Sequence, residues 1–402
     1  MALELGDPYQ FLSEALSPPS ERSISNAILY LESLNALSID NYDPSDPLNG
    51  PYGPTNIHLN TEITPLGYHL ATLPISPRLG KLLLYSVLLQ CVEPMLTIAS
   101  IITTKSPFVT SFHEGGAAAS DDAKSQFSSH QSDVLTILTA YNAWWEMYGQ
   151  DSPQRHIFSS SQEAKYHEET WCRNNSLSAN SLKLIEQMRG QFLNLLQTIG
   201  FISSDETLRS IRSPEGDYNR YGSNVAIIKC ALCCSLSPNI ITLPPYVMET
   251  LPAHSISSGI GKLSEISLGK FLLEYPLQCK RKEVNLYAHP GSLLSKRREL
   301  DSSLLLYVEG MKTSKMYCHD LTTIPAVSLA LFSGRFTCSE RYETITIDGW
   351  LRYQSNKQTL RCLYKITELL DMTFLEKVLD PSSHIPLKWK EVLCVLSRVI
   401  AS

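Results

Sequence analysis

The spacing of apolar residues changes along the chain, and this change is the feature that most limits the folds available to it. As far as residue 237, apolar residues recur mainly at helical spacing. One such stretch contains Leu182, Ile185, Met188, Phe192 and Leu195. Beyond residue 280 they fall in short apolar or alternating runs bounded by turn residues. The first pattern is typical of helices and the second of β-strands, so the sequence predicts a mainly α protein with a C-terminal β-barrel.

The length of the chain indicates more than one domain. A chain of 402 residues is too long for one ordinary hydrophobic core, so two or three domains are expected. Residues 1–75 combine a helical pattern with a short strand, which is typical of a winged-helix domain. Residues 76–237 have the pattern of an all-helical bundle. Residues 238–380 are predicted to form an OB-fold with a trailing helix, and residues 381–402 a C-terminal tail.

Helix start and stop signals place several elements within these regions. Ser76 followed by Pro77 is a typical helix start, because serine caps the first turn and proline suits its first position. Gly200 lies where a long helix should end. Continuous helical patterns also predict helices over residues 225–236 and 357–379.

Five short runs in the last third of the chain are predicted to be strands. They cover residues 284–287, 304–309, 316–318, 327–332 and 343–353. Five strands in a segment of this length suggest a small barrel, for which the five-stranded OB-fold is the best candidate.

Membrane and export signals are not apparent. No run of about 18 uncharged apolar residues occurs, and the first eight residues include Glu4 and Asp7 without an apolar segment. The ten cysteines are mostly scattered singly in apolar patterns, which indicates buried free thiols in a reducing compartment. We therefore expect no membrane partner and a cytoplasmic protein, with the nucleus as the alternative compartment.

Motifs of nucleotide hydrolysis are missing from the sequence. The segment 259–263 comes nearest to a phosphate-binding loop, but no hydroxyl residue follows Lys262, and Ile256 stands where the first glycine belongs. No Asp-Glu-x-His or Asp-Glu-x-Asp sequence occurs. No catalytic residue and no cofactor are therefore expected in this chain.

One Cys-x-x-C spacing could indicate metal or redox chemistry. Cys230 and Cys233, followed by Cys234, lie in an apolar helical run without a second Cys or His pair nearby. Because a structural zinc ion needs four ligands, the pattern favours packing over metal binding.

Local charge is the feature that points to a ligand. The formal net charge is -6, yet residues 262–298 contain eight basic and three acidic residues. Such a patch can bind phosphates, although a solvated loop surface explains charge alone equally well.

Residues beside this patch favour the binding interpretation. A turn contains His289 and Ser292, and the next predicted strand opens with Lys312, Thr313, Ser314 and Lys315. These groups can bond to phosphates or stack on a single strand, whereas the alternative is a polar turn with exposed edge lysines. The predicted RNA-binding residues are His289, Ser292, Lys312, Thr313, Ser314, Lys315 and Arg281.

Several motifs together resemble a known family. In order along the chain they are Gly6-Asp7-Pro8-Tyr9, Leu66-Gly67-Tyr68-His69, Trp171-Cys172-Arg173, His289-Pro290 and Asp348-Gly349-Trp350. They resemble the helicase-associated region of DEAH/RHA-type DExH-box RNA helicases, in particular the large animal members that act on structured RNA. Where the family often has His after Ser-Asp, this chain has Ser132, Asp133 and Val134.

The resemblance implies a function. In that family, two RecA-like domains bind ATP and magnesium and drive 3′-to-5′ movement, while winged helix, ratchet-like bundle and OB-fold enclose single-stranded RNA. The chain is expected to begin where the second RecA-like domain ends and to be the RNA-binding accessory module of such an ATP-dependent helicase. The implied partners are single-stranded RNA, a RecA-like helicase core in cis and a protein cofactor on the winged helix. The alternative is a stand-alone, non-enzymatic RNA- or protein-binding module derived from such a helicase.

Overall fold

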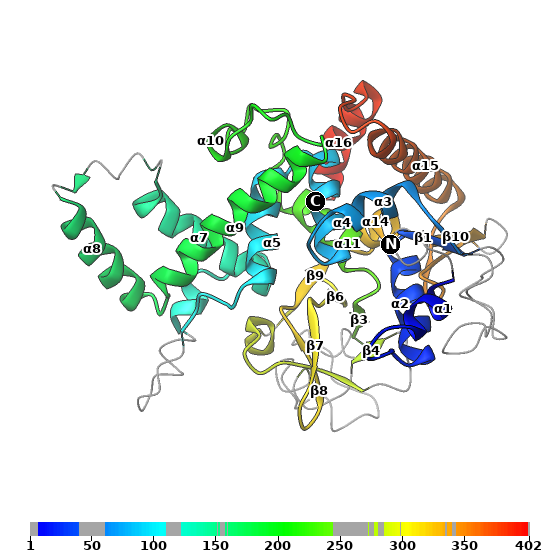
Figure 1. Ribbon diagram of the computed structural model, residues 1–402, viewed down its shortest axis with the longest axis horizontal. Coiled ribbons are helices and arrows are strands. Elements are labelled where there is room, and N and C mark those ends of the chain that lie inside the picture. The colour runs from blue at the N-terminus through cyan, green and yellow to red at the C-terminus, as the bar shows by residue number, and fades with distance from the viewer. Residues whose placement is uncertain are drawn as a thin grey trace, which may run out of the picture.

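The computed structural model shows a mainly helical molecule with small sheets (Figure 1). The structure describes residues 7–39, 61–109, 122–150, 152, 157–158, 160–243, 272, 277–279, 285–297, 299–333, 336–339 and 343–400. In Figure 1 the helices α7, α8 and α9 lie to one side, α15 and α16 above, and the strands β7 and β8 below.

The described residues of the N-terminal region form three short helices and a two-stranded sheet. Its elements are α1 (Pro8–Ser13), α2 (Glu21–Ser33), β1 (Leu37–Ile39), β2 (Thr61–Ile63) and α3 (Pro65–Thr72). The two strands are antiparallel, with Leu37 opposite Ile63. Ile24 and Ile28 lie four residues apart on α2 and are buried with Leu37 in a small core.

The helical bundle extends from the centre of the molecule, where α4 and α11 lie, to the side formed by α7 and α8 (Figure 1). It contains α4 (Pro77–Leu88), α5 (Val92–Thr103), α7 (Asp133–Tyr148), α8 (Ser161–Asn174), α9 (Ala179–Thr198), α10 (Leu208–Ile211) and α11 (Val225–Leu236). The predicted helix start is confirmed, because the Ser76 side chain accepts a hydrogen bond from the Leu79 N–H and Pro77 opens α4. Gly200 has a φ of 79° just after α9, as a helix stop requires.

Seven of the described strands, β3 to β9, form two open sheets after the bundle. They are β3 (Ile240–Thr242), β4 (Gln278–Cys279), β5 (Leu286–Ala288), β6 (Leu304–Leu306), β7 (Glu309–Lys312), β8 (Met316–His319) and β9 (Thr322–Ile324). One sheet has the order β4-β3-β6-β9 and the other β5-β8-β7, with β5 parallel to β8. The strands of the described residues do not close into the predicted barrel.

The predicted strand over residues 327–332 is wrong. This segment is the helix α14 (Ala326–Phe332), which packs against α11. A short apolar run suits a buried strand and a buried helix equally, so its periodicity does not separate the two. Residues 343–353 form two strands, β11 (Thr344–Ile347) and β12 (Leu351–Gln354), in a separate sheet with β10 (Phe336–Ser339).

The C-terminal region contains more structure than a tail. Helix α15 (Lys357–Leu379) has the predicted bounds, and α16 (Leu387–Val399) lies within the segment predicted to be a tail. Trp389 of α16 is fully buried, and its indole N–H donates to the Leu88 carbonyl at 3.0 Å. The C-terminal segment is therefore part of the core.

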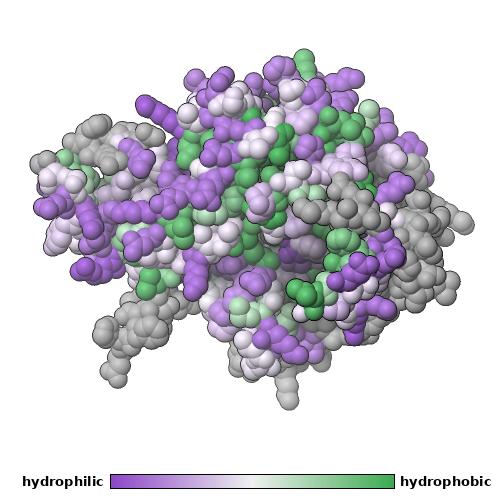
Figure 2. Space-filling model, in the orientation of Figure 1, coloured by the Kyte–Doolittle hydropathy of each residue, from purple (hydrophilic) through white to green (hydrophobic). Residues whose placement is uncertain are grey.

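One large hydrophobic core joins these regions. It extends in sequence from Ala36 to Ile400 and includes bundle helices together with Leu304 and Leu306 of β6. Figure 2 shows apolar residues gathered across the middle of one face, while hydrophilic residues dominate the side formed by α8 and α9. Among the described helices, none is both long and apolar enough to cross a bilayer.

Candidate nucleic-acid interface

One face of the β5-β8-β7 sheet presents a row of rings. Strands β5 and β8 run parallel with Tyr287 opposite Tyr317. Because side chains two residues apart lie on the same face, His289 and His319 share the face of these tyrosines. The opposite face is buried and carries Leu286, Ala288 and Cys318.

The four side chains Tyr287, His289, Tyr317 and His319, here called the ring face, contact one another. The two imidazoles are stacked with centroids 3.9 Å apart and planes at 29°. The ring of Tyr317 meets His289 edge-on at 5.9 Å and lies 6.4 Å from that of Tyr287. All four side chains are partly exposed. Rings on an open strand face can stack on the bases of a single strand.

The β7–β8 hairpin brings cations to the edge of the ring face. Lys312, Thr313, Ser314 and Lys315 are all exposed at its tip, and the Thr313 N–H donates to the Lys315 carbonyl at 2.9 Å. The Lys315 ammonium lies 4.2 Å from the centre of the Tyr287 ring. The structure therefore brings four of the predicted RNA-binding residues together beside rings that could hold bases.

The turn after β5 divides the remaining predicted residues. His289 belongs to the ring face, and its Nδ1 accepts a hydrogen bond from the Gly291 N–H at 3.1 Å. Ser292 is only 3% exposed, and its hydroxyl accepts from the Leu294 N–H at the start of the 3-10 helix η5 (Leu293–Lys296). This serine positions the turn instead of facing solvent. Arg281 lies outside the described residues.

A buried carboxylate of the bundle holds both strand ends of the ring face. Asp133, at the start of α7, is 1% exposed and accepts hydrogen bonds from the Leu293 N–H at 2.8 Å and the Leu321 N–H at 3.0 Å. Leu293 follows the His289 turn, and Leu321 follows β8. The sequence did not predict this role, although Ser132 and Asp133 match the Ser-Asp pair of the family pattern.

Burial changes the ionisation of two groups at this end of the sheet. Burial raises the pKa of Asp320 to about 6, and the neighbouring Asp133 carboxylate adds to the increase. Burial lowers the pKa of His289, as do the positive charges of His319 and Lys124. The Lys124 ammonium is close because it donates to the Gly291 carbonyl at 2.8 Å. Both changes favour the neutral forms of Asp320 and His289.

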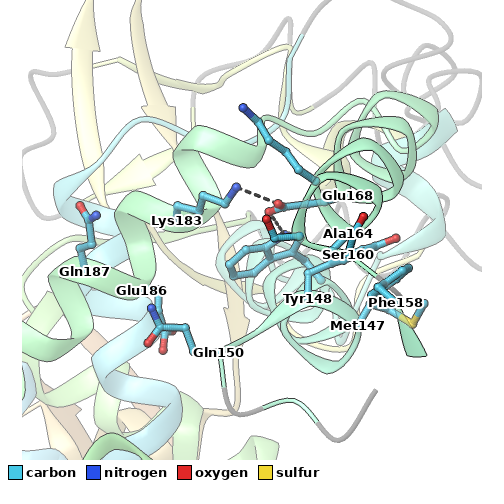
Figure 3. Close-up of a pocket in the computed structure, with 13 residues that line it drawn as sticks. Met147, Tyr148, Gln150, Phe158, Ser160, Ala164, Glu168, Lys183, Glu186 and Gln187 are labelled. Atoms are coloured by element: carbon cyan, nitrogen blue, oxygen red, sulfur yellow. Dashed lines mark hydrogen bonds and ion pairs between the residues drawn. The ribbon is translucent and has the colours of Figure 1, made fainter. Parts of the chain in front are cut away.

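A cleft of about 600 Å³ lies on another part of the molecule, between α7, α8 and α9 (Figure 3). Its lining includes Lys165, Lys183, Glu168 and Glu186. The Glu168 carboxylate accepts from the Trp144 indole at 3.0 Å and pairs with Lys183 at 2.7 Å. Among the described residues that line this cleft, two lysines face two glutamates, so their charges balance, in contrast to the exposed cations of the β7–β8 hairpin.

The cysteine cluster packs as the sequence indicated. Cys230, Cys233 and Cys234 are all buried in α11, and burial raises the pKa of the Cys230 thiol to about 12. Within the described ranges, no group of three or more His, Cys, Asp or Glu side chains is arranged to hold a metal ion.

Two stretches of the chain match the models of known protein families. Residues 76–137 match the helicase associated domain (HA2), ratchet-like, and residues 228–336 match the oligonucleotide/oligosaccharide-binding (OB)-fold. Over its whole length, the chain is homologous to DExH-box RNA helicases. The resemblance seen in the sequence motifs is thus confirmed, and the ring face with its hairpin lies inside the OB-fold match.

Individual relatives show how much of a helicase this chain covers. It is 28% identical to the DExH-box ATP-dependent RNA helicase DExH1 of Arabidopsis thaliana, covering 100% of this chain and 33% of the relative. It is also 28% identical to the human ATP-dependent DNA/RNA helicase DHX36, covering 99% and 34%, and to the human ATP-dependent RNA helicase DHX29, covering 100% and 25%. The chain therefore spans about a third or less of these relatives.

Proposed function

We propose that this chain is the RNA-binding accessory module of a DExH-box ATP-dependent RNA helicase, and that the ring face and the β7–β8 hairpin contact single-stranded RNA. The similarity of the whole chain to part of several RNA helicases supports the first part. The observation that carries the second part is the exposed Lys312–Lys315 tip beside four partly exposed rings.

Each group has a distinct task in this proposal. Lys312 and Lys315 bind backbone phosphates, and the hydroxyls of Thr313 and Ser314 donate hydrogen bonds to phosphate oxygens. Tyr287 and Tyr317 stack on bases, a contact that is worth about 1–3 kcal/mol per base and tolerates many sequences. The site should consequently bind single-stranded RNA with little dependence on its base sequence.

The remaining parts of the proposal concern the rest of a helicase. A RecA-like core in cis binds ATP and magnesium, so the chain by itself neither hydrolyses ATP nor unwinds duplexes. Residues 1–75 form a winged-helix domain that receives a protein cofactor, and the strands of residues 238–380 complete an OB-fold. RNA-stimulated ATPase activity of the rigorously repurified chain would contradict this division of labour.

The test is binding of single-stranded RNA by the purified chain at several salt concentrations. Lys312→Ala should weaken binding alike for unrelated RNA sequences and should lower the slope of log affinity against log salt by about one. Lys365→Ala is the matched control, because Lys365 is an exposed lysine on α15. Thermal melts check that each variant folds. Unchanged affinity and slope in folded Lys312→Ala would mean that the hairpin is only a solvated surface.

A further inference from the structure

We propose that the stacked imidazoles of His289 and His319 form a proton-linked phosphate subsite, whose protonation increases when a backbone phosphate of single-stranded RNA lies against it. This inference rests on the proposed function and adds a regulatory property to the same site. Histidine is the side chain that ordinarily changes charge between pH 5 and 8, so an imidazole pair in a phosphate site links binding to pH.

The geometry allows the pair one positive charge. His289 is held neutral, because its Nδ1 accepts the Gly291 N–H at 3.1 Å and could not do so if it were protonated. Lys124, bonded to the Gly291 carbonyl, adds positive charge beside the same ring. Two imidazolium ions with centroids 3.9 Å apart would also repel each other. The added proton therefore belongs on His319.

His319 is placed to meet a phosphate. It is partly exposed at the end of β8, which is the strand that begins just after Lys315. A phosphate that follows the exposed cations of the hairpin along this strand would reach the imidazole pair. Stacking on the neutral ring of His289 keeps the His319 ring in position, and this arrangement costs little reorganisation on binding.

Three acidic side chains near His319 bear on whether a phosphate can bind there. Glu309 lies opposite His319 in the β7–β8 register and is exposed. Both carboxylate oxygens of Asp133 already accept backbone N–H groups. Asp320 is next to His319 in sequence, and burial raises its pKa to about 6, so its negative charge is lost as the pH falls through that value. Acidification thus removes a repelling charge while it adds an attracting one.

The sign of the pH dependence follows from reciprocity. If the phosphate favours protonated His319, then protonation favours RNA by the same factor. Affinity should rise as the pH falls. We expect about fivefold tighter binding at pH 5.5 than at pH 7.5, the size typical of one partly exposed ion pair.

The experiment measures RNA binding by the full chain between pH 5.5 and 8.0 at constant ionic strength. His319→Gln should abolish most of the pH dependence, and Asp320→Asn should retain the larger part of it. His384→Gln is the matched control, because it removes an exposed histidine between α15 and α16 and should behave like the wild type. Calorimetry of the wild type in two buffers of different ionisation enthalpy counts the proton directly, even if His319→Gln fails to fold.

The outcomes separate the two proposals. Fivefold tighter binding over two pH units corresponds to uptake of about 0.35 proton on average. Uptake of this size near pH 6 that is lost in His319→Gln supports the subsite. RNA binding that ignores pH, or pH dependence that survives in His319→Gln and disappears in Asp320→Asn, overturns it while leaving the proposed function intact. Absence of RNA binding at every pH overturns the proposed function and the subsite together.

Discussion

The helical bundle and the β7–β8 hairpin both contain charged side chains, but their environments are opposite. In the bundle, Arg189 is 0% exposed, and its guanidinium donates to Glu93 at 2.8 Å and to the Thr97 hydroxyl at 2.7 Å. In the hairpin, Lys312 and Lys315 are exposed. The bundle pairs a buried cation with its own carboxylates, whereas the cations of the hairpin are exposed to solvent.

This difference separates structural charges from those that can bind a ligand. The Arg189 network also contains Glu186, which accepts from the Tyr141 hydroxyl, and Arg212, whose guanidinium carbon lies 3.3 Å from the centre of the Trp145 ring. The charged groups of this network interact with one another. An exposed lysine gains little from its own protein and remains able to bind an external phosphate.

The largest predicted effect tests the structural side of the comparison. Arg189→Ala leaves Glu93 as a buried carboxylate without its main partner, so we expect the free energy of unfolding to fall by about 3–5 kcal/mol. Chemical denaturation measures the change. Lys165→Ala is the control, since Lys165 pairs with Glu169 at 4.0 Å and the two side chains are 71% and 52% exposed, and it should cost less than about 1 kcal/mol. Equal losses in both variants would remove the distinction between the two kinds of charge.

An intermediate effect is expected at the junction between the two regions. Asp133→Asn replaces a carboxylate that accepts two backbone N–H groups by an amide with a single acceptor oxygen. Unfolding should become easier by about 1–3 kcal/mol, because one buried N–H loses its partner. Hydrogen exchange at Leu293 and Leu321 should accelerate, and RNA binding should weaken because these amides fix the turns of the ring face. The exposed Asp205→Asn serves as control, and unaltered exchange at both amides would contradict the positioning role.

The smallest predicted effect concerns Asp320 and depends on pH. Burial raises the pKa of its carboxyl to about 6 in the folded protein, above the value of about 4 in an unfolded chain. The stabilisation from its protonated form is therefore complete below about pH 4 and is lost as the pH rises through 6. Asp320→Asn cannot ionise and should be more stable than the wild type by about 1 kcal/mol at pH 7.5, a value reduced for partial exposure.

Denaturation at pH 5.0 and pH 7.5 measures this last effect. The advantage of Asp320→Asn should shrink at pH 5.0, because the wild-type carboxyl is then protonated in the folded state. The backbone at this residue has a φ of 54°, which asparagine also adopts readily, so that strain should contribute little to the difference. An advantage of equal size at both pH values would show that ionisation is not its cause.

Local signals were enough to predict several elements and the exposure of some candidate binding residues. Ser76 and Pro77 fixed the start of α4, and Gly200 the end of α9, because capping and left-handed backbone depend on neighbours within one turn. The exposure of Lys312, Thr313, Ser314 and Lys315 was also predictable, since two cations and two hydroxyls in a row suit a solvent-facing segment. The sequence placed them at the start of a strand, whereas they lie at the tip of the β7–β8 hairpin. The prediction of a strand over residues 327–332 was wrong because an apolar run of six residues suits either a strand or a helix.

The sequence by itself determined where helices begin, which residues are apolar and where positive charge accumulates, because these depend on side-chain type and short-range hydrogen bonds. Only the tertiary structure decided which of those residues meet. The parallel pairing of β5 with β8 stacks His289 on His319, and the bundle carboxylate of Asp133 holds Leu293 and Leu321 from 160 and 188 residues away. The tertiary structure also buries Trp389, which lies in the segment predicted to be a tail. Such contacts form because burial of apolar surface brings distant segments together, and this depends on the whole core and not on any one stretch of chain.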